Sequence, residues 1–439
     1  MTAYWCERAW LEGEGVVEGV VVRVDGTHIS TVTRGQAPAD ATRLAGLTIP
    51  GFANCHSHAF HRALRGRTQR ERGTFWSWRE VMYDVAARLD PDSYYALAKA
   101  TYQEMALAGI TAVGEFHYLH HDRDGSSYDE PNAMGHALVA AARDAGVRLT
   151  LLDTCYLSSG FGAPPEGVQV RFTDGDAAQW QERVAALGNR TDPQVVVGAA
   201  IHSVRAVPRD QLATVAAAMP EAPLHVHLSE QQAENTACLD RYGCTPTQLL
   251  ADEGVLDDRL SAVHATHLTS DDIAQLGAAR ATSCLCPTTE RDLADGVGPA
   301  PALADAGAGL TLGSDSHAVI DFFEEMRALE LDTRLTTQRR GHWRADALLS
   351  AATADGHRSL GFADAGRIAA GCWADLVTVD LGSVRTAGTG TTEESLVFAA
   401  SAADVTSVVS GGVRLDRDSG TVGSDLERAI GDVLEAAGR

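Results

Sequence analysis

The feature that most constrains the fold is a repeated alternation of apolar, strand-like runs with helical stretches. Eight such runs occur, at residues 47–56, 110–117, 147–156, 194–203, 223–229, 260–266, 280–287 and 308–316. Helical stretches lie between them, for example at residues 92–109 and 132–146, and the second ends at a glycine, a typical C-terminal stop. Alternation predicts an α/β fold with a parallel sheet, and eight repeats predict a closed (β/α)8 barrel of the TIM type. Active groups are then expected at the C-terminal ends of the strands.

The two ends of the chain carry a different, shorter β pattern. Residues 16–34 are rich in valine and threonine around an Asp-Gly turn, which is typical of antiparallel hairpins. Near the other end, residues 376–380 and 405–415 read as strands, and the latter contain a Gly-Gly turn. We therefore predict a small β-sandwich built from residues 1–49 and 365–439, the second part also carrying a terminal helix, beside a barrel of residues 50–364.

Charge and cysteine content limit the partners and the compartment. The chain has 439 residues and a formal charge of -23, which opposes sequence-independent attraction to nucleic acid or anionic membranes, so neither is an expected partner. The start of the chain does not resemble a secretory signal, and no run of eighteen apolar residues occurs, which predicts a cytoplasmic protein. The eight scattered cysteines contain no CxxC pair, which predicts buried thiols rather than disulfides or a zinc knuckle.

Histidines and an aspartate recur at the predicted strand ends. His56 and His58 are two residues apart at the end of the first strand, so both side chains project to one face. His227 ends the fifth strand and Asp315 the eighth, and imidazole and carboxylate are the ligands of zinc sites. We therefore predict that these four residues bind metal. Asp315 can alternatively cap the next helix, and His225, one pair deeper, is expected to be a hydrogen-bonded barrel histidine.

Other strand-end groups are suited to moving protons. Glu230 follows His227 by three residues, which places an unligated carboxylate beside water on the metal. His264 ends the sixth strand and can hydrogen-bond that water or a developing charge, whereas His267 is expected to be a loop or packing residue. Asp315 can accept a proton from the water. We predict that Glu230, His264 and Asp315 are the catalytic residues.

Together, the HxH pair, the later histidines and the terminal aspartate resemble the amidohydrolase superfamily over nearly the whole chain. This resemblance implies one or two metal ions, and two-metal sites usually need a carboxylated lysine on a central strand. Lys99 is the only lysine and falls in a helical stretch, so one divalent metal is expected, zinc in preference to iron. A single metal favours the deaminase branch, in which the glutamate matching Glu230 protonates the leaving nitrogen.

Segments outside the metal motif resemble a narrower family, the formimidoylglutamate deiminases. They are residues 56–60, 75–80, 115–121, 202–207 and 263–268. The resemblance implies hydrolysis of N-formimidoyl-L-glutamate to N-formyl-L-glutamate and ammonia, a step of histidine degradation. It also implies that the residues at matching positions contact the substrate, namely Arg79, Tyr118, His202 and Arg205. His61 stands where glutamine is often found, and it is a further candidate because both side chains hydrogen-bond polar groups.

The substrate class agrees with the arginines. A dicarboxylate amidine needs forked cations for its acids, and Arg79 and Arg205 can supply them. Each also has a simpler interpretation, Arg79 as a solvated charge on an aromatic-rich lid and Arg205 as a surface loop residue. A guanine-like nucleobase aminohydrolase is the nearest alternative and predicts an uncharged aromatic pocket instead.

Two further functions are alternatives. A cyclic-amide hydrolase generally needs two metals. A metal-binding scaffold without turnover would not need Glu230 at the end of the fifth strand or His264 at the end of the sixth. His117, His120 and His121 are expected to form hydrogen bonds around Tyr118 rather than to bind metal. We expect the chain to act as a homodimer on a small-molecule substrate.

Overall fold

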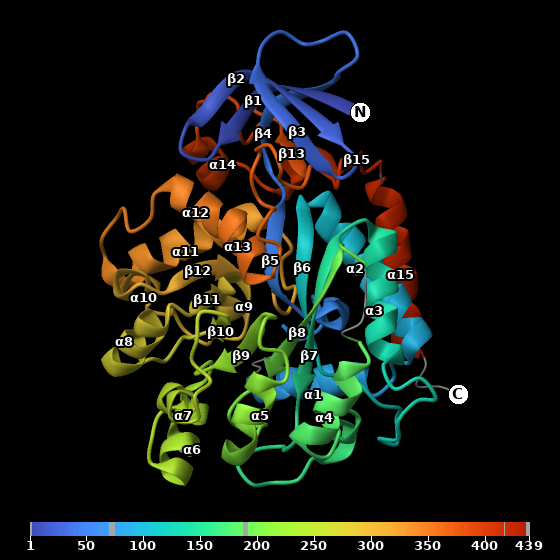
Figure 1. The fold of residues 1–439 in the computed structure, drawn as a ribbon, viewed down its shortest axis with the longest axis vertical. Coiled ribbons are helices and arrows are strands. Elements are labelled where there is room, and N and C mark those ends of the chain that lie inside the picture. Colours follow the sequence, from blue (N-terminus) through green and yellow to red (C-terminus); the bar gives the residue numbers. More distant parts are fainter. Residues whose placement is uncertain (1, 70–74, 188–191, 417, 436–439) are drawn as a thin grey trace.

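The computed structural model describes residues 2–69, 75–187, 192–416 and 418–435, and its central element is a sheet of eight strands (Figure 1). In spatial order these strands are β5 (Phe52–Ser57), β6 (Ile110–His117), β7 (Arg148–Cys155), β8 (Val195–Ile201), β9 (Leu224–Leu228), β10 (Leu260–His264), β11 (Thr282–Leu285) and β12 (Gly309–Leu312). All neighbours are parallel. A parallel bridge between Ser57 and Asp315 joins the two outer strands. The sheet thus closes, and the predicted (β/α)8 barrel is confirmed.

Helices lie on both sides of the barrel strands (Figure 1). Those between the strands are α1 (Phe75–Ala86), α2 (Pro91–Leu107), α3 (Ala133–Ala145), α4 (Ala177–Ala185), α5 (Leu212–Ala217), α6 (Gln232–Tyr242), α7 (Pro246–Asp252), α8 (Ser270–Ala279), α9 (Pro287–Asp292) and α10 (Ala300–Ala306). Short 3-10 turns are η1 (Ala59–Leu64), η2 (Gly167–Arg171), η3 (Arg209–Gln211) and η4 (Ala402–Asp404). After β12 follow α11 (Phe322–Thr337), α12 (Ala345–Ala352), α13 (Ala354–Ser359), α14 (Glu393–Ala399) and α15 (Ser419–Glu435).

Local sequence explains where these helices begin and end. At the start of α2, Asp90 and Ser93 form a reciprocal capping box, and Pro91 occupies the first turn, where no backbone donor is needed. At the end of α3, Gly146 has a φ of +68°, a left-handed conformation that glycine adopts without steric cost. Lys99 lies within α2 and contacts Tyr95, so it does not reach the barrel mouth.

Strands from both chain ends form a second sheet of seven strands (Figure 1). Its order is β15 (Val413–Arg414), β14 (Val405–Ser410), β13 (Leu376–Val379), β4 (Thr42–Pro50), β1 (Thr2–Leu11), β2 (Gly15–Asp25) and β3 (His28–Arg34). The N-terminal β4 pairs with the C-terminal β13 in antiparallel register. Both chain ends thus come together beside the barrel as predicted, but their strands form one seven-stranded sheet where a β-sandwich was expected.

The first predicted barrel strand, residues 47–56, is divided between the two sheets. Its first part belongs to β4 and pairs with β1 and β13, whereas β5 begins at Phe52 and pairs with β6. Gly51 stands between them, and a Cβ at this position would lie 2.2 Å from the Thr111 hydroxyl oxygen. A continuous apolar run shows that a segment is buried, but it does not show where its hydrogen-bonding partners change.

The cysteines are free thiols, and six of the eight are buried, which agrees with the sequence expectation. Among the described residues, no helix combines the length and the apolar character that a membrane crossing requires.

Candidate active site and metal centre

Four side chains converge at the C-terminal mouth of the barrel. They are His56 and His58 at the end of β5, His227 in β9 and Asp315 after β12. Nε2 of His56 lies 3.0 Å from Nε2 of His227 and 3.4 Å from Oδ1 of Asp315, and Nε2 of His58 lies 3.4 Å from the same oxygen. Ligand atoms that share one zinc ion at 2.0 to 2.1 Å in a tetrahedron are about 3.3 Å apart. The spacing among His56, His58 and Asp315 therefore fits a bound ion, and His227 adjoins this group through His56.

Backbone carbonyls orient two of these imidazoles. Nδ1 of His58 lies 3.0 Å from the Phe116 carbonyl, and Nδ1 of His227 lies 2.9 Å from the His202 carbonyl. A carbonyl only accepts, so each Nδ1 carries the hydrogen and each Nε2 presents a lone pair to the centre. Burial lowers the pKa of His58 to about 3 and that of His227 well below its usual value, which keeps both rings neutral.

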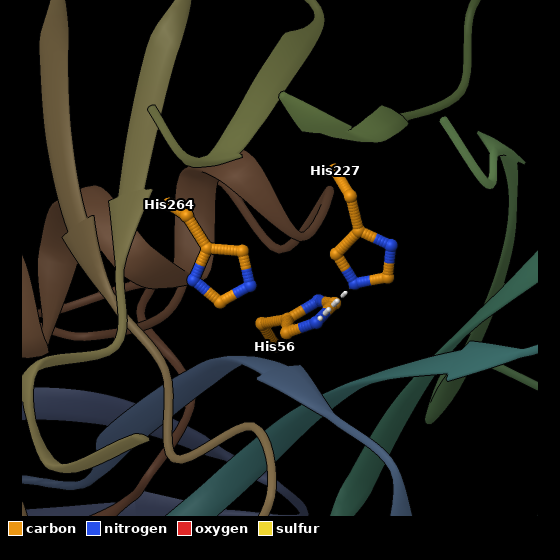
Figure 2. A group of neighbouring side chains, drawn as sticks. All are labelled: His56, His227 and His264. Atoms are coloured by element: carbon orange, nitrogen blue, oxygen red, sulfur yellow. Dashed lines mark hydrogen bonds between the residues drawn. The ribbon is translucent and has the colours of Figure 1, made fainter. Parts of the chain in front are cut away.

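The donor set as a whole suits a divalent cation. Figure 2 shows the rings of His56, His227 and His264 turned toward one another from different strands. His56 is fully buried, and among the described residues its Nδ1 has no hydrogen-bond partner. Burial by itself raises the pKa of the Asp315 carboxyl, but the surrounding imidazoles outweigh this and hold it well below its usual range. Neutral nitrogens around one carboxylate are the donors that zinc takes in catalytic sites.

Glu230 and His264 lie beside the metal ligands. Oε1 of Glu230 is 3.9 Å from Nε2 of His264, and that nitrogen is 3.7 Å from Oδ2 of Asp315. Burial raises the pKa of Glu230, and the nearby Asp315 and Glu290 raise it further, against His264 and Arg205. Burial lowers the pKa of His264, but the carboxylates of Glu230, Glu290 and Asp315 outweigh it and raise the pKa well above its usual value. Glu230 and His264 can therefore hold and pass a proton next to the metal site.

A cavity opens above this centre. Besides His58, His227, Glu230, His264 and Asp315, it is lined by all five predicted substrate contacts, which are His61, Arg79, Tyr118, His202 and Arg205. The structure thus brings together every side chain proposed for this site, and all of them except the fully buried His56 line the cavity.

The cavity lining carries both positive and negative groups. Nε of Arg205 donates to Oε2 of the buried Glu234 at 3.2 Å, and the Arg79 guanidinium lies 5.2 Å above the ring of Tyr83. Burial lowers the pKa of His202 well below its usual value, and Arg205 adds to this effect. The same cavity therefore presents two arginines and three phenols together with the carboxylates of Glu230 and Asp315. Such a pocket suits a ligand with both anionic groups and a cationic amidine.

His61 contacts Tyr118 in the lining of the cavity. It lies in η1, where its Nε2 is 3.1 Å from the Tyr118 hydroxyl. The same hydroxyl lies 3.6 Å from the Met82 sulfur. Burial lowers the pKa of His61 well below its usual value, so this ring is a neutral hydrogen-bonding group.

The three neighbouring histidines do not gather around Tyr118 as expected from the sequence. His117 and His120 group with Asp153, and Nε2 of His121 is 3.1 Å from Asp174. Both oxygens of Asp153 accept from the Arg183 guanidinium, at 2.9 and 3.0 Å. A cation thus already pairs with this buried carboxylate, which favours a structural ion-pair network at this place.

Sequence reasoning missed several side chains at the site. Glu290 on α9 lies 3.4 Å from Nδ1 of His264, and Glu234 on α6 pairs with Arg205. Tyr83 and Tyr156 line the cavity. Tyr156 directly follows the last residue of β7. The rule that active groups lie at the C-terminal ends of barrel strands, which pointed to the proposed metal ligands, therefore also predicts Tyr156.

The chain is similar to known proteins over most of its length. The sequence model of the amidohydrolase family matches residues 47–415. A formimidoylglutamate deiminase of Pseudomonas aeruginosa is 39% identical over 396 residues, which are 87% of this chain and 86% of that protein. An 8-oxoguanine deaminase of the same organism is 29% identical over 429 residues, 94% of this chain and 92% of that one. The crystal structure of an amidohydrolase from Brucella melitensis aligns with a TM-score of 0.90 and 32% identity, covering 99% of this chain and 100% of that chain.

Proposed function

The chain belongs to the amidohydrolase family, and we propose that it hydrolyses N-formimidoyl-L-glutamate to N-formyl-L-glutamate and ammonia. The observation that carries this proposal is that one cavity is lined both by Arg79 and Arg205 and by Glu230 with the proposed metal ligands His58, His227 and Asp315. The substrate carries the matching groups, because it has carboxylates on one part and a cationic formimidoyl group on the other. The similarity to the Pseudomonas aeruginosa formimidoylglutamate deiminase supports this choice.

We propose one zinc ion as the cofactor, held by His56, His58, His227 and Asp315. Imidazole and carboxylate also suit iron, and zinc is preferred here because neutral imidazoles with one carboxylate are its usual donors in catalytic sites. Bound there, a divalent ion lowers the pKa of a coordinated water from about 15.7 toward about 7 and so makes it nucleophilic at neutral pH.

The surrounding residues position the reactants and move protons. Asp315 and His264 orient the water toward the formimidoyl carbon, which is electrophilic as an amidinium. Glu230 takes a proton from the attacking oxygen and gives it to the departing nitrogen, so that ammonia leaves rather than an amide anion. Its raised pKa suits this exchange, because the carboxyl can hold the proton between the two steps.

We propose that Arg79 and Arg205, in the lining of the same cavity, bind the substrate carboxylates. Tyr118 and His202 complete this lining, and His61 holds the Tyr118 hydroxyl. Glu234 fixes the guanidinium of Arg205 from behind, which leaves its outer nitrogens for the ligand.

A nucleobase aminohydrolase is the alternative, and the 8-oxoguanine deaminase similarity represents it. A neutral ring has no need of two arginines in its pocket. The test is ammonia release from N-formimidoyl-L-glutamate, guanine and cytosine, measured side by side with metal content on the same preparation. We expect turnover of the acyclic acid alone, with about one zinc per chain. Rapid turnover of guanine without turnover of the acid would replace the proposed function.

The homodimer and the cytoplasmic compartment stay predictions. Light scattering on the purified protein checks the first, and fractionation of the source cells checks the second.

A further inference from the structure

Gln169 lies in η2, and its side chain is 3% exposed. Its Nε2 is 2.9 Å from the hydroxyl of Tyr83 and 2.9 Å from the hydroxyl of Tyr156. Its Oε1 accepts from the backbone N–H of Glu166 at 3.0 Å. One buried amide thus contacts two phenols that both line the cavity.

The contact with Glu166 settles which way this amide faces. A backbone N–H only donates, so the atom facing it is the amide oxygen, and the NH2 group faces the tyrosines. The NH2 group has two hydrogens, and each phenol oxygen accepts one of them. The hydroxyl hydrogens of Tyr83 and Tyr156 must therefore point away from Gln169.

Burial raises the pKa of Tyr156 well above its usual value, and the neighbouring Tyr83 adds to this effect, so Tyr156 is a donor at neutral pH. At most one of the two hydroxyl hydrogens is used between the phenols themselves, so at least one remains for another acceptor, and both phenols line the cavity. The positive charges of Arg205 and Arg79 lower the pKa of Tyr156, against the rise that burial causes. Hydroxyl hydrogens and guanidinium groups thus face the same space, and an anion is the group that accepts from both.

We propose that Gln169 is a positioning residue for substrate specificity. By donating both amide hydrogens to Tyr83 and Tyr156, it turns their hydroxyl hydrogens toward a substrate carboxylate held beside Arg79 and Arg205. This inference rests on the proposed function for the identity of the carboxylate. The contribution is to binding, because the phenols neighbour the arginines, with Arg79 over the ring of Tyr83 and both arginines acting on Tyr156.

Gln169→Glu is the sharpest test because it keeps the shape and reverses the hydrogen bonds. A carboxylate at this position accepts the phenol hydrogens and withdraws them from the cavity. We expect KM for N-formimidoyl-L-glutamate to rise about 10- to 100-fold while kcat stays within about threefold. The control is Gln181→Glu, the same chemical change on an exposed position of α4, for which both constants should stay unchanged.

A neutral variant separates positioning from the added charge. Gln169→Met removes the two donated hydrogens without a new charge, and we expect KM to rise about 3- to 10-fold. The same substitution in a Tyr83→Phe/Tyr156→Phe background should have almost no further effect, because no hydroxyl remains to be oriented. An equal rise in both backgrounds, or a fall in kcat with KM unchanged, overturns the proposal. Melting temperatures of all variants show whether each has folded.

Glutarate binding separates this inference from the proposed function. Glutarate is a dicarboxylate without an amidine, so calorimetry measures carboxylate recognition in the zinc-loaded protein without turnover. Weaker glutarate binding by Gln169→Glu and Gln169→Met supports the inference, whether or not the wild type releases ammonia. Absence of ammonia release by the wild type contradicts only the proposed function. If both variants turn over N-formimidoyl-L-glutamate fully, with unchanged KM and unchanged glutarate affinity, the result contradicts only the inference about Gln169.

Discussion

Ser57 and Asp315 pair across the seam at which the barrel closes. The backbone N–H of Asp315 donates to the His56 carbonyl at 2.9 Å, and the N–H of His58 donates to the Asp315 carbonyl at 3.3 Å. Three of the four proposed metal ligands are therefore brought together by main-chain hydrogen bonds. These main-chain hydrogen bonds thus help to hold the three side chains at the seam.

Asp315→Asn should therefore lose metal without losing the fold. Asp315 has a φ of +41°, a left-handed conformation that asparagine tolerates and that costs alanine about 1 kcal/mol or more. The amide keeps the seam but removes the anionic ligand. We expect zinc content to fall at least tenfold, with a melting temperature within a few degrees of the apo wild type. Asp315→Ala should lose the metal and also melt lower, and plasma mass spectrometry with thermal unfolding measures both.

Glu230→Gln tests the proton transfer apart from metal binding. The amide keeps the size of the side chain but carries no transferable carboxyl proton, so kcat should fall about 10²- to 10⁴-fold. Glu230 is not a proposed ligand, so zinc content should equal that of the wild type. Near wild-type turnover in a fully metallated variant would contradict the role given to Glu230.

Arg205→Met should weaken substrate binding more than turnover. A charge-assisted hydrogen bond contributes about 1.5 to 3 kcal/mol, which predicts a KM rise of about 10- to 100-fold. Arg205→Lys should restore only part of the loss, because an ammonium lacks the forked geometry. Arg209→Met is the matched control, since that arginine pairs with Glu253 and Asp252 and does not line the cavity. Steady-state kinetics on all three variants check this.

The strand-end rule explains why the sequence alone pointed to the proposed metal ligands. His56, His227 and Asp315 lie at or just after the ends of apolar runs, and parallel strands bring such ends to one mouth wherever they lie in the chain. The reaction and the five substrate contacts came instead from the family resemblance, which the charged groups in the cavity lining then supported.

Residues outside this rule were not predictable. Glu290 reaches His264 from α9, and Gln169 reaches two tyrosines from a short 3-10 turn, and neither position has a periodic signal. The boundary at Gly51 was missed for a related reason, because an apolar run shared by two sheets looks like one strand. His117, His120 and His121 showed metal-like spacing, but the deciding partner, Arg183, lies more than 60 residues away in sequence.

The last prediction concerns the joint between the barrel and the second sheet. Arg148 at the start of β7 pairs with Asp375 just before β13, and both side chains are at most 2% exposed. Thr111 and the backbone N–H of Gly411 also donate to this carboxylate, at 3.3 and 2.8 Å. Burial raises the pKa of Asp375, but Arg148 outweighs it and lowers the pKa below its usual value.

Asp375→Asn leaves the guanidinium buried without its counter-charge, so we expect a loss of about 3 to 5 kcal/mol in the free energy of unfolding at pH 7. Because the folded-state pKa is depressed, the pair stabilises the protein above the unfolded pKa of about 3.9 and loses this effect as pH falls through the folded value. The difference between wild type and variant should therefore shrink at about pH 3. An Arg148→Met/Asp375→Leu double variant should recover much of the stability at pH 7, since it removes both charges. Urea unfolding of the three proteins at both pH values measures these differences, and a difference that does not depend on pH would show that the pair does not act through its charge.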